Sequence, residues 1–370
     1  MIIPLILLFI FVLAVIVQLY YYGIIFSKLS GYKGKTASKN ELPISVIICA
    51  KNEAKNLKAL IPLLVEQDYP KFEIVLINDS SYDKTLKVMN KAKETYDNIK
   101  IVDVKEVDRF KSHKKYALTL GIKAASYDYL LFTDADCKPN SKHWISTMAN
   151  QFSNNKHIVL GYGKYEKRKG SLLNALIRFE TLLAATQYLS YALNNNPYMG
   201  VGRNMAYKKD LFFENNGFFN HMDVMSGDDD LLINSIATST NTTISIEPDS
   251  FTTSIPANGL GKWIQQKRRH ITTASYYKKG HKMTLAMFYI SNITFLAIGA
   301  TLLILWHQPI LVATLILFRY LFQIITLGKI ANKLEEKDII LLFPLLEILL
   351  VIVQFNIFIM NLISKPKRWS

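Results

Sequence analysis

The chain has 370 residues, a length that allows one large or two ordinary domains. Half of the residues are apolar, the formal net charge is +15, and there are two cysteines. The charge does not indicate nucleic-acid binding, because no RNA- or DNA-binding motif is present and Lys and Arg crowd the flanks of apolar segments, as in membrane proteins. Cys49 and Cys137 suit a reducing compartment and form neither a disulfide framework nor a zinc motif.

Residues 2–26 form a nearly unbroken apolar segment. At about 1.5 Å per residue, a helix of this length crosses a hydrocarbon core of about 30 Å. A cleaved signal peptide is the alternative, but the segment lacks a charged start, is too long and has no clear cleavage site. We therefore expect an uncleaved anchor at residues 1–27. The four lysines within residues 28–39 place the next domain on the cytoplasmic side.

Strand and helix patterns alternate in the following part of the chain. The expected strands are residues 44–49, 72–77, 101–104 and 130–133, and the expected helices are residues 53–66, 84–96 and 116–125. Further on, the pattern predicts a helix at 144–152, a strand at 158–165 and a long helix at 172–193. This alternation is typical of an α/β domain with a mostly parallel sheet covered by helices on both faces.

Acidic side chains follow two of the predicted strands. Asp79 comes just after residues 72–77, and Asp134 and Asp136 come after residues 130–133. The carboxyl ends of parallel strands meet at one edge of a sheet, where ligands bind. An isolated pair of this spacing is common by chance and is then a solvated turn. At this edge, however, two carboxylates can hold a divalent cation, Mg²⁺ or Mn²⁺, which in turn binds a diphosphate.

Two further segments are rich in charge. Residues 226–230 read Ser-Gly-Asp-Asp-Asp ahead of a predicted helix at 231–238. Acids at such a position are also favoured by helix capping and by the helix dipole. Residues 263–277 are strongly basic and include three aromatic side chains. A basic amphipathic helix lying on anionic lipid is one interpretation of this second segment, and a helix that lines a binding site is the other.

The order of these motifs resembles that of membrane-bound, processive-type family 2 glycosyltransferases, which have a GT-A fold. The likeness covers about residues 43–277 and includes the family's D, D-x-D, E-D and Q-x-x-R-W motifs. The resemblance implies that Asp136 and Asp134 bind the metal. It assigns the nucleotide-sugar donor to Ala50, Asn52, Glu53, Asp79, Lys114 and Asp134. His113 stands where the family's G-K-x-x-A-L stretch has glycine.

The same resemblance assigns the general base to the three successive acids. By alignment with the E-D pair, Asp229 is the expected base and Asp228 its neighbour, although three adjacent acids leave the choice among Asp228, Asp229 and Asp230 open. A carboxylate near a second carboxylate can have its pKa raised toward a useful value. Both catalytic assignments therefore depend on how this short segment is oriented.

Two motifs are expected on the acceptor and diphosphate side. Gly202 and Arg203 resemble the family's acceptor-side loop, and Gln266 and Arg269 match the Q-x-x-R-W signature. Arginine offers a planar fork of donors to phosphate or sugar oxygens. His270 replaces the tryptophan of the signature, which weakens the inference that the enzyme is processive.

The end of the chain is apolar again, with candidate spans at residues 283–306, 309–327 and 339–363. Together with the first segment they make four spans, with the N-terminus outside. The basic tail at 365–370 would then also lie outside, against the positive-inside rule. One solution is that the last segment, which contains Pro344 and Glu347, is partly re-entrant or interfacial.

Two charged residues fall within these apolar segments, Arg319 in the second and Glu347 in the third. Charged side chains are costly in lipid and are usually paired there. Each lies about eight residues from the cytoplasmic end of its span, and the two spans would be antiparallel, so we expect a buried Arg319–Glu347 ion pair.

These expectations combine into four parts: an anchor at 1–27, a cytoplasmic GT-A domain at 43–258, a basic interfacial helix at 259–281 and about three spans at 282–364. The resemblance implies an inverting, hexosyl-transferring enzyme of the inner or plasma membrane. It would move a sugar from a UDP-linked nucleotide-sugar to a lipid-linked or glycan acceptor in cell-envelope polysaccharide or glycolipid synthesis. The alternative is a non-catalytic membrane protein whose GT-A domain binds a nucleotide-sugar or a partner.

Overall fold

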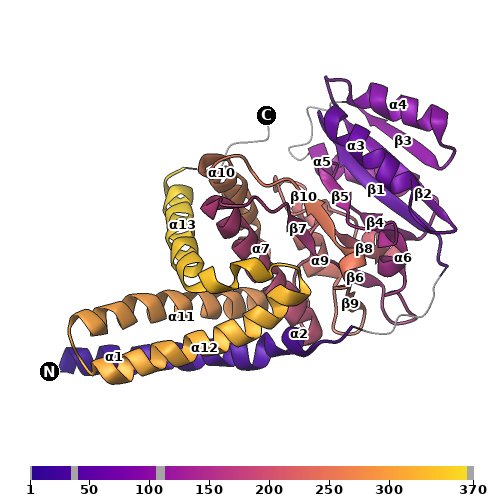
Figure 1. Cartoon of the computed structure of the whole chain (residues 1–370). Helices are drawn as coiled ribbons and strands as arrows, with labels where there is room; N and C mark the ends of the chain where they lie inside the picture. Colours follow the sequence, from indigo (N-terminus) through magenta and orange to yellow (C-terminus); the bar gives the residue numbers. More distant parts are fainter. Residues whose placement is uncertain (1, 35–40, 106–112, 365–370) are drawn as a thin grey trace.

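The computed structural model describes residues 2–34, 41–105 and 113–364 (Figure 1). Two of the lysines used to predict sidedness, Lys35 and Lys39, and the basic tail lie outside the described residues. An α/β domain occupies one end of the molecule, and long helices from both ends of the chain extend from it.

A seven-stranded sheet forms the centre of the α/β domain. Its strands are β1 (Ile44–Ala50), β2 (Phe72–Asp79), β3 (Ile99–Val104), β4 (Tyr129–Phe132), β6 (Ile158–Leu160), β8 (Met205–Lys208) and β9 (Thr242–Ile244). They are ordered β3-β2-β1-β4-β8-β6-β9, and the first four are mutually parallel, whereas β8 is antiparallel to both of its neighbours. The predicted mostly parallel sheet is confirmed.

Helices cover both faces of this sheet because side chains alternate between its faces along each strand. They are α3 (Ala54–Val65), α4 (Thr85–Thr95), α5 (His113–Ala124), α6 (Trp144–Ala149), α7 (Leu172–Leu193), α8 (Lys209–Glu214) and α9 (Asp230–Ile236). On β1, Ile47 packs with α5 and α7 on one face, whereas Val46 and Ile48 pack with α3, α4 and α6 on the other. The predicted helices in this part of the chain are confirmed, with ends that differ by a few residues.

The single strand expected at residues 158–165 is wrong, because the chain bends at Gly161 and forms β6 and then β7 (Gly163–Tyr165). The Gly161 N–H donates to the Asn204 carbonyl at 3.0 Å, and a Cβ atom at Gly161 would lie 2.6 Å from the Asn204 side chain. β7 joins a separate three-stranded sheet with β5 (Cys137–Pro139) and β10 (Thr252–Ser254). β5 begins directly after Asp136 and so fixes the backbone there.

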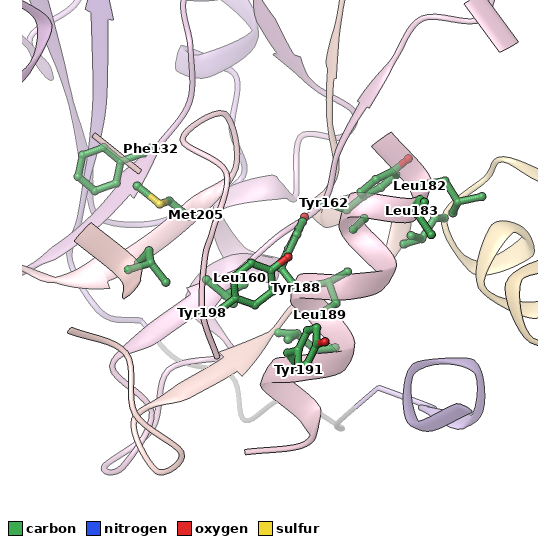
Figure 2. Packing of buried hydrophobic residues seen from close by; sticks show 14 of the residues in the cluster. Phe132, Leu160, Tyr162, Leu182, Leu183, Tyr188, Leu189, Tyr191, Tyr198 and Met205 are labelled. Carbon is green, nitrogen blue, oxygen red and sulfur yellow. The ribbon is translucent and has the colours of Figure 1, made fainter. Parts of the chain in front are cut away.

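α7 runs through the middle of the core, although its sequence is rich in polar and aromatic residues. Figure 2 shows Tyr188 and Leu189 of this helix beside Leu160 and Tyr162. The Tyr188 hydroxyl donates to the Gly161 carbonyl at 2.7 Å, so its polar end is satisfied where the chain bends. The aromatic bodies fill the core and their hydroxyls find partners, which explains how such a helix is buried.

Four helical stretches are long and apolar enough to cross a membrane, and each contains one of the long terminal helices. These helices are α1 (Ile2–Tyr20), α11 (Lys279–Ile304), α12 (Pro309–Lys333) and α13 (Phe343–Ile363). A π-helical turn, η1 (Tyr21–Ile25), and the short helix α2 (Ser27–Gly31) follow α1, and α10 (Leu260–Ile271) precedes α11. The predicted basic helix is therefore present, but it ends at Ile271.

The predicted ion pair between Arg319 and Glu347 is confirmed. The Arg319 guanidinium donates to both Glu347 oxygens, at 2.8 and 2.6 Å, and both side chains are buried. Gln18 of α1 and Asn292 of α11 also accept hydrogen bonds from Arg319, at 2.7 and 3.1 Å. One polar cluster therefore joins all four long helices.

Candidate active site

Three of the predicted site residues lie at the carboxyl ends of neighbouring strands, at one edge of the sheet. After β1 the chain adds β2 on one side, and later β4 on the other, so a crevice opens at the carboxyl ends of β1 and β4. Ala50 is the last residue of β1 and Asp79 the last residue of β2, and Asp134 is the second residue after β4. The parallel order of these strands is what brings the three positions together.

The turns after β1 and β2 are joined by hydrogen bonds. The Asn52 N–H donates to Ser81 Oγ at 3.0 Å, and its side-chain oxygen accepts from the Tyr82 N–H at 3.1 Å. The Glu53 N–H donates to Thr85 Oγ1 at 2.8 Å. Asn52 has a φ of 58°, a left-handed conformation that asparagine tolerates better than most residues. These bonds fix the turn that contains the predicted donor-binding residues Asn52 and Glu53 to the turn after β2.

Asp134, Asp136 and Cys137 form a compact group whose potential ligand atoms all lie within 4.8 Å of one another. Desolvation by the surrounding protein, together with the nearby Asp134 carboxylate, raises the pKa of Asp136. Burial raises the pKa of the Cys137 thiol well above its usual range, so the thiol stays protonated beside Ser254 Oγ. The two carboxylates therefore remain as hard oxygen ligands, a donor set that fits Mg²⁺ or Mn²⁺.

Lys114 links the two acidic motifs. Its ammonium lies 2.8 Å from Asp228 Oδ2 and 3.4 Å from Asp134 Oδ1. Burial opposes ionisation of Asp228, but the charge and hydrogen bond of Lys114 outweigh it and lower the pKa of that carboxyl group. A pocket at this point is lined by Cys49, Lys114, Asp134, Gly202 and Asp228, together with apolar side chains. Asp228 is thereby held as a carboxylate beside Lys114.

The three successive acids point to three different partners. Asp228 binds Lys114, whereas Asp229 Oδ2 accepts the Gly202 N–H at 2.7 Å and its Oδ1 accepts the Asp230 N–H at 2.8 Å. Asp230 is buried and accepts hydrogen bonds from the hydroxyls of Tyr277, at 2.6 Å, and Thr273. Asp230 thus has a structural role, fastening α9 to the segment after α10.

Asp229 has the proton affinity that a general base requires. Burial, with the charges of Asp228 and Asp230, raises the pKa of Asp229 to about 7. A carboxyl group near this value can accept a proton at neutral pH and still be partly ionised beforehand. The hydrogen bond from Gly202 fixes its orientation, so one predicted acceptor-side residue positions the predicted base.

The remaining acceptor-side residues lie around this point. The Arg203 guanidinium stacks on the Tyr165 ring at 4.6 Å from its centroid. Gln266 and Arg269 are on α10, and Thr273, the second residue after this helix, donates to Asp230 of the three acids. α10 therefore lies next to the site, and contact of Gln266 or Arg269 with a diphosphate or acceptor stays a prediction.

Two residues important for the site were not identified from the sequence. Lys115 is fully buried and donates to the carbonyls of His221 and Val224, at 2.7 and 2.9 Å, which shapes the loop ahead of the three acids. Its spacing from Leu118 and Ile122 along α5 could have indicated the buried face. Asn204 donates to the Tyr162 and Ser250 carbonyls and fixes the loop that carries Arg203; no sequence pattern indicates this.

The fold is of the GT-A class of α/β folds. Its features are parallel strands on both sides of the point between β1 and β4 where the strand order reverses, the paired acids after β4, and helices on both faces of the sheet. Residues 45–214 match the family model described as Glycosyl transferase family 2. This match covers slightly less than half of the chain, and over these residues the chain is similar to family 2 glycosyltransferases.

Known proteins resemble different parts of the chain. A poly-beta-1,6-N-acetyl-D-glucosamine synthase of Staphylococcus epidermidis is 38% identical over 93 residues, which are 25% of this chain and 21% of that protein. An uncharacterized glycosyltransferase of Haemophilus influenzae is 28% identical over 158 residues, 42% of this chain and 44% of that one. The chain thus spans less than half the length of these relatives.

Among solved structures, a mannosyltransferase from Pyrobaculum calidifontis, in complex with GDP-Man and Mn²⁺, has a TM-score of 0.60 and 18% sequence identity. The similarity covers 94% of this chain and 98% of that one, so it includes the terminal helices. At this identity it supports the fold.

Proposed function

We propose that this protein is a membrane-bound inverting glycosyltransferase that moves a sugar from a nucleotide-sugar, UDP-linked, to a lipid-linked or glycan acceptor. The step would serve cell-envelope polysaccharide or glycolipid synthesis. The observation that carries the proposal is Asp229, a carboxyl group with a pKa raised to about 7. Asp229 accepts the Gly202 N–H at 2.7 Å, and Gly202 lines a pocket together with Asp228 and Asp134.

The base assignment follows from what each of the three acids is free to do. Asp228 is neutralised by Lys114 and Asp230 is engaged by two hydroxyls. Asp229 would accept the proton of the acceptor hydroxyl while that oxygen bonds to the anomeric carbon. The bond from that carbon to the diphosphate oxygen breaks on the opposite face, so the configuration inverts. The nucleoside diphosphate then leaves with the bonding electrons.

On the donor side, the chain's own residues bind and orient the nucleotide-sugar. The turns that contain Asn52 and Glu53, together with Asp79, would hold the nucleoside. Asp134 and Asp136 would hold Mg²⁺ or Mn²⁺, which when bound supplies positive charge for the diphosphate. Support for this assignment comes from the two hard carboxylates, and from the solved mannosyltransferase that contains Mn²⁺. Arg203 would add hydrogen-bond donors for phosphate oxygens. Arg269 would do the same when α10 turns toward the crevice.

The membrane assignment is supported by the four long apolar helices. We place the catalytic domain at the cytoplasmic face of the inner or plasma membrane, where nucleotide-sugars are made available. The domain division keeps an anchor at 1–27, the GT-A domain at 43–258 and the interfacial segment at 259–281. The core helix α7 and the basic helix α10 both pack along α13, where a lipid-linked acceptor could approach from the bilayer.

A donor panel tests the activity directly. The purified full chain in lipid nanodiscs is mixed with nucleotide-sugars, Mn²⁺ and a lipid extract as acceptor, and nucleoside diphosphate release is measured. We expect release with one donor of the panel. Binding of a nucleotide-sugar with no release from any donor would support the non-catalytic alternative instead.

Asp229→Asn tests the base. A general base contributes roughly 10²- to 10⁴-fold to a rate, so we expect a loss of this size in transfer with unchanged donor affinity. Asp223→Asn is the matched control, because Asp223 is an exposed acid of the same segment, and it should leave both quantities unchanged. Full transfer by Asp229→Asn would show that another group takes the proton.

A further inference from the structure

α13 is long enough to cross a bilayer, yet its surroundings differ from those of the other long helices. At about 1.5 Å per residue, its 21 residues make a helix of about 30 Å. α1, α11 and α12 pack against one another, whereas α13 packs along α7 and α10 of the catalytic end. Figure 1 shows α13 standing beside α10 and across the direction of α11 and α12.

The segment that leads into α13 is bound to the catalytic domain. Asp338, in the turn before the helix, accepts two hydrogen bonds from Arg178 of α7, at 2.9 and 2.6 Å, and lies 2.8 Å from Lys167. Glu336 is buried and accepts from Arg178 at 2.7 Å. The start of this stretch is therefore on the same side of the membrane as the domain that carries Arg178.

The other end of α13 is bound to that same side. Arg268 of α10 donates to Asn361 Oδ1 at 2.7 Å, to the Ser364 carbonyl at 2.6 Å and to Ser364 Oγ at 2.9 Å. α10 is itself fixed to the catalytic domain, because Trp263 is buried in the core and Lys267 pairs with Glu180 of α7 at 2.5 Å. A helix whose two ends are held by groups of one domain cannot have its ends on opposite sides of the bilayer.

An apolar stripe covers the outer face of α13. Ile348, Ile352, Phe355, Ile359 and Leu362 are all exposed and recur at helical spacing. Exposed stripes of this kind on a helix beside membrane spans indicate contact with lipid. Leu341 and Leu345, which precede the stripe in the sequence, are exposed as well.

We infer that α13 does not cross the membrane, so that the chain crosses it three times. α13 enters the bilayer beside Arg319 and returns to α10 on the same side. It is thus a re-entrant, interfacial helix whose exposed stripe lies in the leaflet next to the catalytic domain. The basic tail then shares a side with Lys329 and Lys333, which agrees with the positive-inside rule.

Cysteine accessibility tests the crossing number in the full chain. Three variants are labelled with a membrane-impermeant maleimide, before and after the membrane is permeabilised, and the labelled peptide is identified by mass spectrometry. Ser370→Cys reports the tail, Gln308→Cys the loop between α11 and α12, and Lys91→Cys the exposed surface of α4. The inference requires Ser370→Cys to label together with Lys91→Cys, and Gln308→Cys to label under the opposite condition.

Labelling of Ser370→Cys together with Gln308→Cys would overturn the inference, whichever side the catalytic domain occupies. A second measurement tests the lipid contact, with an environment-sensitive fluorophore on Phe355→Cys in nanodiscs. Lipids with brominated acyl chains should reduce its emission, whereas the same fluorophore on Lys91→Cys should be unaffected. Unchanged emission at Phe355→Cys would show that the stripe is covered by protein, such as a second copy of the chain, and would overturn the interfacial placement.

Discussion

One neighbour orients the Asp229 carboxylate, and other neighbours raise its pKa. Gly202 holds one carboxylate oxygen, while burial and the charges of Asp228 and Asp230 raise the pKa to about 7. A base must be deprotonated before it can accept the acceptor's proton, so the rate should rise with pH up to about 7 and level off above it. The check is the pH profile of kcat/KM from pH 5 to 9, with Asp223→Asn expected to show the same profile. A rate that does not change below pH 7 would contradict this assignment.

Lys115 stabilises the loop that precedes the three acids. Its buried ammonium bonds two carbonyls of the loop ahead of Asp228. Lys115→Met keeps the shape of the side chain but removes the Lys115 donor from the Val224 carbonyl and leaves the His221 carbonyl with only the Val224 N–H. A fully buried polar group that loses its partner costs about 1–3 kcal/mol. We expect a clear fall in the free energy of unfolding and weaker transfer.

The matched control is Lys123→Met, because Lys123 is an exposed lysine of the same helix, and exposed substitutions usually change stability by less than about 0.5 kcal/mol. Denaturant unfolding of both variants gives the comparison. Equal stability of the two would mean that the loop does not depend on Lys115.

At the level of elements, the loop between α12 and α13 is held to α7 by Arg178. Arg178→Gln would leave Glu336 buried and α13 without its anchor at the domain. Removing one partner of a buried ion pair typically costs about 3–5 kcal/mol, so we expect a loss of this size in the free energy of unfolding. Lys167→Gln is the control, because its pair with Asp338 is partly exposed and solvent-exposed pairs contribute about 1 kcal/mol or less. A smaller effect from Arg178→Gln than from Lys167→Gln would refute the anchor.

Elements whose signal is local could be predicted from the sequence, and those that depend on distant partners could not. β1, β2 and α7 follow from apolar runs and helical spacing, and the paired acids after β4 follow from the parallel order of strands. The break at Gly161 depends on Asn204, and the structural role of Asp230 depends on Tyr277, which lies 47 residues further on. No local pattern distinguishes three adjacent acids, because their roles are set by partners in α5, the Gly202 loop and the segment after α10.

At the scale of the whole molecule, polar contacts connect the membrane helices to the catalytic end at two levels. Arg319 joins all four long helices inside the bundle, and Arg178 and Arg268 hold both ends of the α13 stretch at the domain. These contacts fix the position of the catalytic end relative to the bundle of long helices.

The Arg319–Glu347 pair gives the sharpest test of this arrangement. Glu347→Gln removes the only carboxylate that contacts Arg319 among the described residues, leaving a buried cation with amide partners in a surrounding of low polarity. We expect a loss of about 3–5 kcal/mol in stability, measured as a lower thermal unfolding midpoint in nanodiscs. Because replacing a whole buried pair by apolar residues is often neutral, Arg319→Met combined with Glu347→Leu should recover most of that loss. Asn356→Leu, at an exposed position of α13, should leave the midpoint unchanged. A Glu347→Gln variant as stable as the parent chain would show that the pair does not hold the helices together.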